Sequence, residues 1–150
     1  MALTLNKIVK TITDLGNAHQ QIKSVYFGDL VDYLSRGTEN LYPSLYVDLT
    51  GGNIAEKSVV LNFSLYFFDR VLHEETNETE VLSDMLEVCQ DFIAQLRYQN
   101  FEFDEGLSAN LTFFTDDTPE LLGGVRADIT LDIPYIANRC IVPSTYSYPS

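Results

Sequence analysis

The chain of 150 residues contains no tryptophan and only two cysteines, two histidines and two methionines. Two cysteines, Cys89 and Cys140, cannot form the dense disulfide framework of a small secreted domain, so the chain is typical of a reducing cytoplasm. Histidine is the commonest general base and metal ligand, yet His19 and His73 share no spacing that would make a metal pair. We therefore expect no metal site and no cofactor.

Recognised catalytic and nucleotide-binding motifs are also missing. The chain has no P-loop, GxGxxG or GxSxG pattern, and its glycine doublets fall where hairpin turns are expected. The acidic residues between Asp69 and Glu80 suggest a cation site, but they lack the regular ligand spacing and the glycine of a calcium loop. A solvated loop that leads into a helix explains the same charges. The sequence predicts that this protein is not an enzyme.

Basic residues are scarce, because nine Lys and Arg stand against 22 Asp and Glu, which gives a formal net charge of −13. This balance argues against a surface that binds nucleic acid, since such surfaces need clustered Lys and Arg. It is compatible with a wall that encloses passing DNA and repels its backbone, and also with an ordinary solvated surface. No run approaches the ~18 consecutive apolar residues of a membrane span, and the first residues do not resemble a secretory signal.

What the chain does contain is apolar and aromatic: 45% of its residues are hydrophobic, including nine Phe and nine Tyr. Such a composition is typical of a globular protein with a substantial core. We expect residues 1–138 to form a single α+β domain. Residues 139–150 lack periodicity, and we expect them to form a C-terminal extension.

Two amphipathic helices are predicted from apolar residues spaced three and four apart. The first runs from about Thr4 to about Gln20. The second begins at Asn77, which forms a pattern like a capping box with Glu80, and it continues to Arg97. Its apolar stripe consists of Val81, Leu82, Met85, Leu86, Cys89, Phe92, Ile93 and Leu96. Because we expect this stripe to be buried, Leu86→Ala should cost ~2–5 kcal/mol.

Alternating residues predict the strands. A short run from Lys23 to Phe27 is followed by a hairpin that turns at Gly51-Gly52-Asn53. A second hairpin joins a strand ending near Phe113 to one from Val125 to Ile133, through a turn that includes Gly123 and Gly124. The expected fold is α+β: an antiparallel sheet of two hairpins plus a short strand, with two amphipathic helices packed on one face.

Aromatic and apolar residues exceed what this core needs. They either line a second, smaller core or contact other proteins, because aromatic residues are enriched in interfaces. The residues concerned are Tyr26, Phe27, Tyr42, Tyr46, Tyr66, Phe68, Phe114, Tyr146 and Tyr148.

Five segments, taken in order, resemble a known family. They read FGDLVDYL, LYPSLYVDL, LNFSLYFFDRV, ETNETEVLSDMLEVCQDFIAQLR and IPYIANRCIVP, and they span Phe27 to Pro143. Together they resemble the tail-terminator and tail-completion (neck ring) proteins of tailed phages, with the closest likeness to members from phages of Bacteroidetes-type hosts. None of these motifs is catalytic, so the resemblance rests on their order and spacing.

The resemblance implies a structural virion protein, a homo-oligomeric ring at the neck or the head-proximal end of a tail, which joins head or portal to tail around the DNA channel. Its partners would be itself and other neck, portal or tail-tube proteins. It would enclose DNA without sequence-specific binding and contact no membrane, and it would be made in the host bacterial cytoplasm. A head–tail adaptor ring bound to the portal is the alternative. A small ligand-binding or enzymatic α+β domain is a more distant one, which a deep pocket with convergent polar groups would favour.

We expect the subunit interfaces to involve the loops Gly28–Asn40 and Leu72–Thr76 and the tail from Arg139. These segments combine length and aromatic content with a lack of internal periodicity. The candidate interface residues are Phe27, Asp29, Tyr33, Tyr42, Tyr46, Arg70, His73, Glu74, Glu75, Arg139, Tyr146 and Tyr148.

Overall fold

The computed structural model of the chain describes residues 4–28, 41–71, 78–98, 104–105, 109–117 and 121–134, together with Thr145. The prediction of an α+β fold is confirmed. In chain order the elements are α1 (Leu5–Ala18), β1 (Ser24–Phe27), β2 (Ser44–Ile54), β3 (Ser58–Arg70), α3 (Glu78–Tyr98), β4 (Asp104–Glu105), β5 (Asn110–Asp117) and β6 (Leu121–Pro134).

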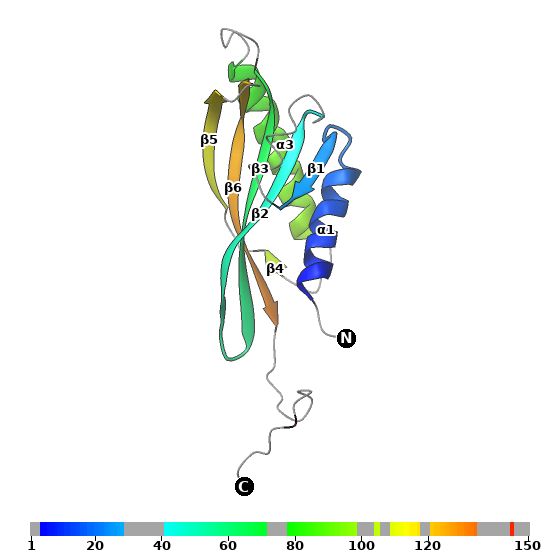
Figure 1. Cartoon of the computed structure of the whole chain (residues 1–150), viewed down its shortest axis with the longest axis vertical. Helices are drawn as coiled ribbons and strands as arrows, with labels where there is room; N and C mark the ends of the chain where they lie inside the picture. Colours follow the sequence, from blue (N-terminus) through cyan, green and yellow to red (C-terminus); the bar gives the residue numbers. More distant parts are fainter. Residues whose placement is uncertain are drawn as a thin grey trace.

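The strands form one mixed sheet in the order β1-β2-β3-β6-β4, and β5 also pairs with β6. β5 lies beside the first half of β6 (Figure 1), and β4 pairs with its second half, so both pair with the side of β6 that faces away from β3. The expectation of a purely antiparallel sheet is wrong for β1, which runs parallel to β2. The first residues of the two strands are paired, Ser24 of β1 with Ser44 of β2, and so are Phe27 and Val47. The chain therefore returns to the start of β1 before β2 begins, and the two strands run in the same direction.

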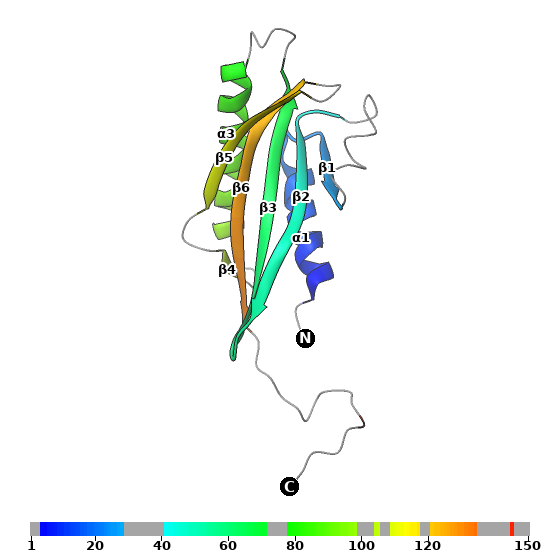
Figure 2. The same cartoon turned by 60° about the vertical axis from the view of Figure 1, so that its left-hand side comes forward.

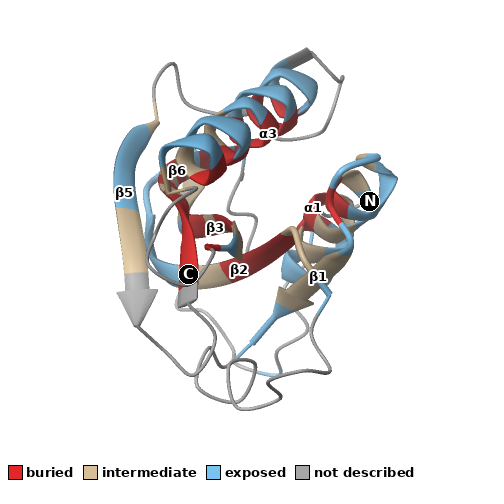
Figure 3. Ribbon diagram, turned by 90° about the horizontal axis from the view of Figure 1, so that it is seen from above, coloured by how far each residue is buried: buried red, intermediate tan, exposed pale blue. Residues whose placement is uncertain are grey.

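Both helices lie on one side of the sheet, as the view from above shows (Figure 3). Helix α1 is capped by Thr4, whose hydroxyl accepts a hydrogen bond from the backbone N–H of Lys7 at 3.3 Å. Gly16, near its C-terminal end, is buried: a Cβ added there would lie 2.9 Å from the side chains of Leu45 and Val25. The missing side chain therefore lets α1 approach β1 and β2 closely.

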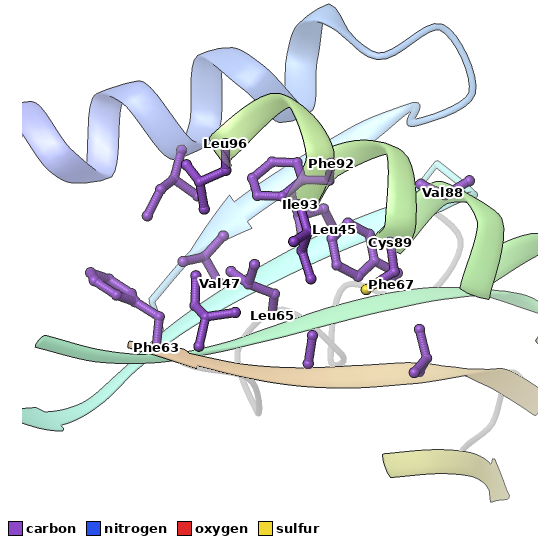
Figure 4. Packing of buried hydrophobic residues seen from close by; sticks show 14 of the residues in the cluster. Leu45, Val47, Phe63, Leu65, Phe67, Val88, Cys89, Phe92, Ile93 and Leu96 are labelled. Carbon is purple, nitrogen blue, oxygen red and sulfur yellow. The ribbon is translucent and has the colours of Figure 1, made fainter. Parts of the chain in front are cut away.

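The main core fills the space between the helices and the sheet (Figure 4). Phe92 of α3 meets Phe67 of β3 edge to face, with 5.6 Å between the ring centroids. Val88, which was left out of the predicted stripe, is buried, whereas Leu82 and Leu86 are only half-buried. The buried side of α3 is therefore rotated relative to the predicted stripe, because α3 contacts α1 as well as the sheet.

A second, smaller cluster covers part of the opposite face of the sheet. Tyr46, Phe68 and Leu122 are buried there, and half-buried aromatic residues pack around them: Tyr26, Tyr42, Tyr66 and Phe114. Neighbouring strand residues point to opposite faces, so Phe67 enters the main core while Phe68 enters this one. Six of the aromatic residues singled out in the sequence thus belong to a second core.

The glycine doublets do not form the turns that the sequence predicted. Strand β2 extends through Gly51 and Gly52 to Ile54, and Gly123 and Gly124 lie within β6. The long hairpin of β2 and β3 instead turns at residues 55–57 (Figure 2). A Cβ on Gly124 would collide with the carbonyl oxygen of Phe67, so close approach of the neighbouring backbone explains this glycine.

We predict that Gly124→Ala destabilises the protein by ~1–3 kcal/mol or more, because the added methyl group collides with β3. Gly51→Ala is the matched control, since a Cβ at Gly51 meets nothing within 4 Å. Urea unfolding of the two variants measures the difference. Equal midpoints for both variants would contradict the close approach of β6 to β3.

We also predict that Phe92→Ala lowers the free energy of unfolding by ~3–5 kcal/mol, because Phe92 is fully buried against Phe67. Leu86→Ala should cost less than ~2 kcal/mol, below the sequence-based expectation, because Leu86 is half-buried. Thermal or chemical unfolding of both variants measures which substitution causes the larger loss of stability. A larger loss of stability for Leu86→Ala than for Phe92→Ala would contradict the observed orientation of α3, in which Phe92 is buried and Leu86 is half-buried.

Candidate functional site

Side chains capable of chemistry are dispersed over the structure. Among the residues that the structure describes, no group of three or more His, Cys, Asp and Glu could hold a metal ion. Three places in the described structure hold side chains that could take part in chemistry. They are a histidine–aspartate pair between the helices, a buried cysteine on α3, and an arginine–aspartate pair on the sheet.

His19 connects the two helices. Its Nδ1 accepts a hydrogen bond from the backbone N–H of Gln21, and its Nε2 lies 3.1 Å from the Asp91 carboxylate on α3. This geometry assigns the ring proton to Nε2, which donates to Asp91. The pair borders an open groove whose other lining residues are Ala18, Gln20, Gln21, Glu87, Ala94 and Gln95. The groove is open, and the His19–Asp91 contact beside it connects the end of α1 to α3.

Cys89 is buried on the sheet-facing side of α3. Burial raises the pKa of its thiol to about 12, because the thiolate would lose its hydration in the core. The thiolate is the nucleophilic form of cysteine, so this residue is chemically inert at neutral pH.

A polar network crosses from β3 to β6 on the face of the sheet opposite the helices. The Arg126 guanidinium lies 3.2 Å from Oδ2 of Asp128, and the Ser64 hydroxyl donates to Oδ1 at 2.6 Å. A hydrogen bond with the Tyr66 side chain and the charge of Asp128 raise the pKa of Arg126. Each oxygen of Asp128 accepts one hydrogen bond, and the network thereby connects β3 to β6.

The aromatic cluster lies on this same face, beside the polar network. Tyr46 packs between Tyr26 and Tyr66, at centroid distances of 6.0 and 5.6 Å. The Arg70 guanidinium lies 4.9 Å from the centroid of the Tyr42 ring, which is a cation–π contact. Tyr42, Tyr46 and Arg70, predicted as interface residues, are thus brought together, and Tyr46 is buried within the subunit.

Phe27, a fourth candidate, lies at the end of β1 with 39% of its surface exposed. The other predicted interface residues lie outside the described residues, as do both interface loops (apart from Gly28) and almost all of the predicted extension. They stay predictions: Asp29, Tyr33, His73, Glu74, Glu75, Arg139, Tyr146 and Tyr148.

The structure reveals an exposed apolar surface that sequence reasoning missed. Leu111 and Phe113 of the edge strand β5 are 43% and 49% exposed. Their alternating pattern looked like that of an inward-facing strand, and only their position at the edge of the sheet exposes them. At the opposite edge of the sheet, Phe27 of β1 is 39% exposed, and Leu5 of α1 is 43% exposed.

None of the described helices is long and apolar enough to cross a membrane. In comparisons with known proteins, no family model and no curated protein matches this chain.

We predict that Cys89 reacts slowly with a thiol reagent in the folded protein. At pH 8, a thiol of pKa about 12 holds about 1,000-fold less thiolate than one of the ordinary pKa of 9.0. The measurement compares the labelling rate in buffer and in denaturant, using a Cys140→Ser variant so that Cys89 is the only thiol. Rapid labelling of the folded variant would contradict the burial of Cys89.

The same pKa shift predicts a pH dependence of stability. Between pH 9 and pH 12 the unfolded chain releases the Cys89 proton while the folded chain keeps it, so this residue makes the protein less stable as the pH rises. Unfolding curves of the Cys140→Ser variant at pH 8 and pH 10 should therefore diverge more than those of the Cys89→Ala/Cys140→Ser variant. Identical pH dependence of the two variants would contradict the shift.

Proposed function

We propose that this chain is a structural virion protein of the tail-terminator type. It forms a homo-oligomeric ring at the neck or the head-proximal end of a phage tail and joins head or portal to tail around the DNA channel. The proposal starts from the order of the family-like segments between Phe27 and Pro143. The structural observation that supports it best is the exposure of large apolar side chains at two opposite edges of the sheet.

Opposite exposed edges suit a ring because each subunit of a ring presents two different surfaces, one to each neighbour. Leu111 and Phe113 lie on β5, while Leu5 and Phe27 lie on the side of α1 and β1 (Figure 1). Such apolar side chains gain free energy when another subunit removes them from water.

The acidic composition supports an enclosing role for this ring. With a net charge of −13, the chain repels the phosphate backbone and lets DNA pass without sequence-specific binding. A non-catalytic role is supported by the reactive groups themselves. Cys89 is held as a neutral thiol, and Asp128 has both oxygens engaged.

The same observations also support the alternative, a head–tail adaptor bound directly to the portal. Ring symmetry separates the two, since sixfold symmetry favours a tail terminator and twelvefold symmetry an adaptor. The more distant alternative, a ligand-binding or enzymatic domain, has the groove beside His19 and Asp91 as a candidate site among the described residues.

A cryo-electron microscopy reconstruction of tailed particles assembled with this chain tests the proposal. We expect copies of the chain to surround the DNA channel near the portal or the top of the tail. Particles assembled without the gene are the control, and we expect their heads and tails to be unjoined. Purified complete particles that lack the chain would refute the proposal.

A further inference from the structure

We infer that residues 144–148 of one copy bind as an added strand along the β5 edge of a neighbouring copy. The β5 edge consists of the free side of β5 together with the exposed side chains of Leu111 and Phe113. Residues 144–148, called the tyrosine arm below, contain Tyr146 and Tyr148. The inference rests on the proposed ring and adds to it one contact between neighbouring subunits.

The β5 edge is an apolar strand edge that can accept one more strand. β5 pairs with β6 along its whole length, and the described strands place no partner on its other side. Leu111 and Phe113 lie opposite Ala127 and Val125 of the main core, so their side chains point to the helix side of the sheet. They stay exposed because α3 packs over β3 and β6. β5 contains no lysine or proline, the residues that commonly block pairing at an edge.

The tyrosine arm has the side-chain spacing that this edge requires. A strand added to an edge binds through its backbone, and its alternate side chains lie beside those of the edge strand. Leu111 and Phe113 are two residues apart, and so are Tyr146 and Tyr148. Aromatic and apolar side chains paired across two strands stabilise a sheet. Prolines stand only on either side of the arm, at positions 143 and 149, and proline is tolerated at the ends of edge strands.

The arm also lies in the part of the chain that another copy repels least. Residues 133–150 contain no Asp or Glu and form the longest stretch of the sequence without one. Elsewhere the net charge of −13 makes copies of the chain repel one another. The β5 edge itself has a carboxylate beside it, since Oε1 of Glu78 accepts a hydrogen bond from the Thr115 hydroxyl at 2.8 Å. An uncharged segment can therefore bind at this edge without the cost of bringing like charges together.

The position of β4 favours a neighbouring copy over the arm's own copy. β4 pairs with Leu131 and Asp132 of β6, between Pro134 and the residues of β6 that pair with β5. A segment that returned from Pro134 to its own β5 would have to pass around β4. Thr145, which belongs to the arm, is exposed in the single copy. Tyr146 follows Pro134 by 12 residues, an extended reach of about 40 Å, so the arm can extend to another subunit.

An arm and an edge on the same chain produce a head-to-tail contact. Each copy binds one neighbour through its arm and another neighbour through its β5 edge. Repetition of such a contact closes into a ring when the rotation between copies permits it. A symmetric pair of two β5 edges would instead stop at two copies.

Two full-length variants that each block one side of the contact test the inference. Phe113→Glu places a negative charge on the β5 edge, and Tyr146→Ser/Tyr148→Ser removes the aromatic rings of the arm. Phe113 is 49% exposed, so we expect its variant to fold, and circular dichroism verifies the fold of both variants. Ile54→Glu is the matched control, because Ile54 is 75% exposed at the end of β2 and away from β5.

Sedimentation velocity at concentrations up to about 1 mM measures association. We expect the wild type and Ile54→Glu to associate equally, and each blocked variant to associate at least ~10-fold more weakly. A 1:1 mixture of the two blocked variants should form heterodimers and nothing larger. The reason is that the Phe113→Glu copy keeps an intact arm and the tyrosine variant keeps an intact edge.

A synthetic peptide measures the contact directly. The probe is a fluorescein-labelled peptide of residues 141–150, and fluorescence anisotropy follows its binding to the Tyr146→Ser/Tyr148→Ser variant, whose β5 edge is intact. Adding Phe113→Glu to that variant should weaken binding at least ~10-fold. A peptide with serine in place of both tyrosines is the matched control, and we expect the same loss.

Other results would overturn the inference. Undiminished association of the tyrosine variant alone would indicate a symmetric contact of two β5 edges, and rings formed by both blocked variants would place the interface elsewhere while the proposed ring stands. A wild type that stays monomeric at about 1 mM, or a peptide that binds equally with and without Phe113→Glu, would also overturn it. Failure of the proposed function looks different: the arm would bind the β5 edge as expected, but purified particles would lack the chain.

Discussion

The pairing of β3 with β6 is the constraint on which the rest of the structure depends. The two strands run antiparallel from Ser58 opposite Pro134 to Arg70 opposite Leu122, at the centre of the sheet. Their register sends Phe63, Leu65 and Phe67 into the main core. A slip of one residue would exchange the two faces and place these side chains on the side without helices.

The face without helices shows how the sheet is stabilised where no second layer covers it. Tyr46 and Phe68 are buried among other aromatic rings, and Arg126, Asp128 and Ser64 form a charged hydrogen-bond network next to them. Charge-assisted hydrogen bonds are stronger than neutral ones, and here they connect the two central strands. Arg126, Asp128 and Ser64 are thus engaged in connecting the strands of the sheet.

The edges of the sheet matter in a different way, because strand pairing stops there and leaves side chains exposed. Leu111 and Phe113 would be buried if α3 lay over β5, but α3 packs over β3 and β6. The proposed ring assigns these side chains to a neighbouring copy.

The sequence by itself determined the local elements, because the periodicity of α1 and α3 and the alternation of β3 and β6 are properties of neighbouring residues. It also supplied the family-like segments from which the proposed function starts. The tertiary structure decided what depends on distant residues. It placed β1 parallel to β2, and it put Gly52 and Gly124 inside strands, since a glycine required by close packing looks the same in sequence as one required by a turn. It buried Tyr46, a predicted interface residue, and exposed Phe113, because burial depends on which element lies above a strand and the spacing of residues along the chain does not record that.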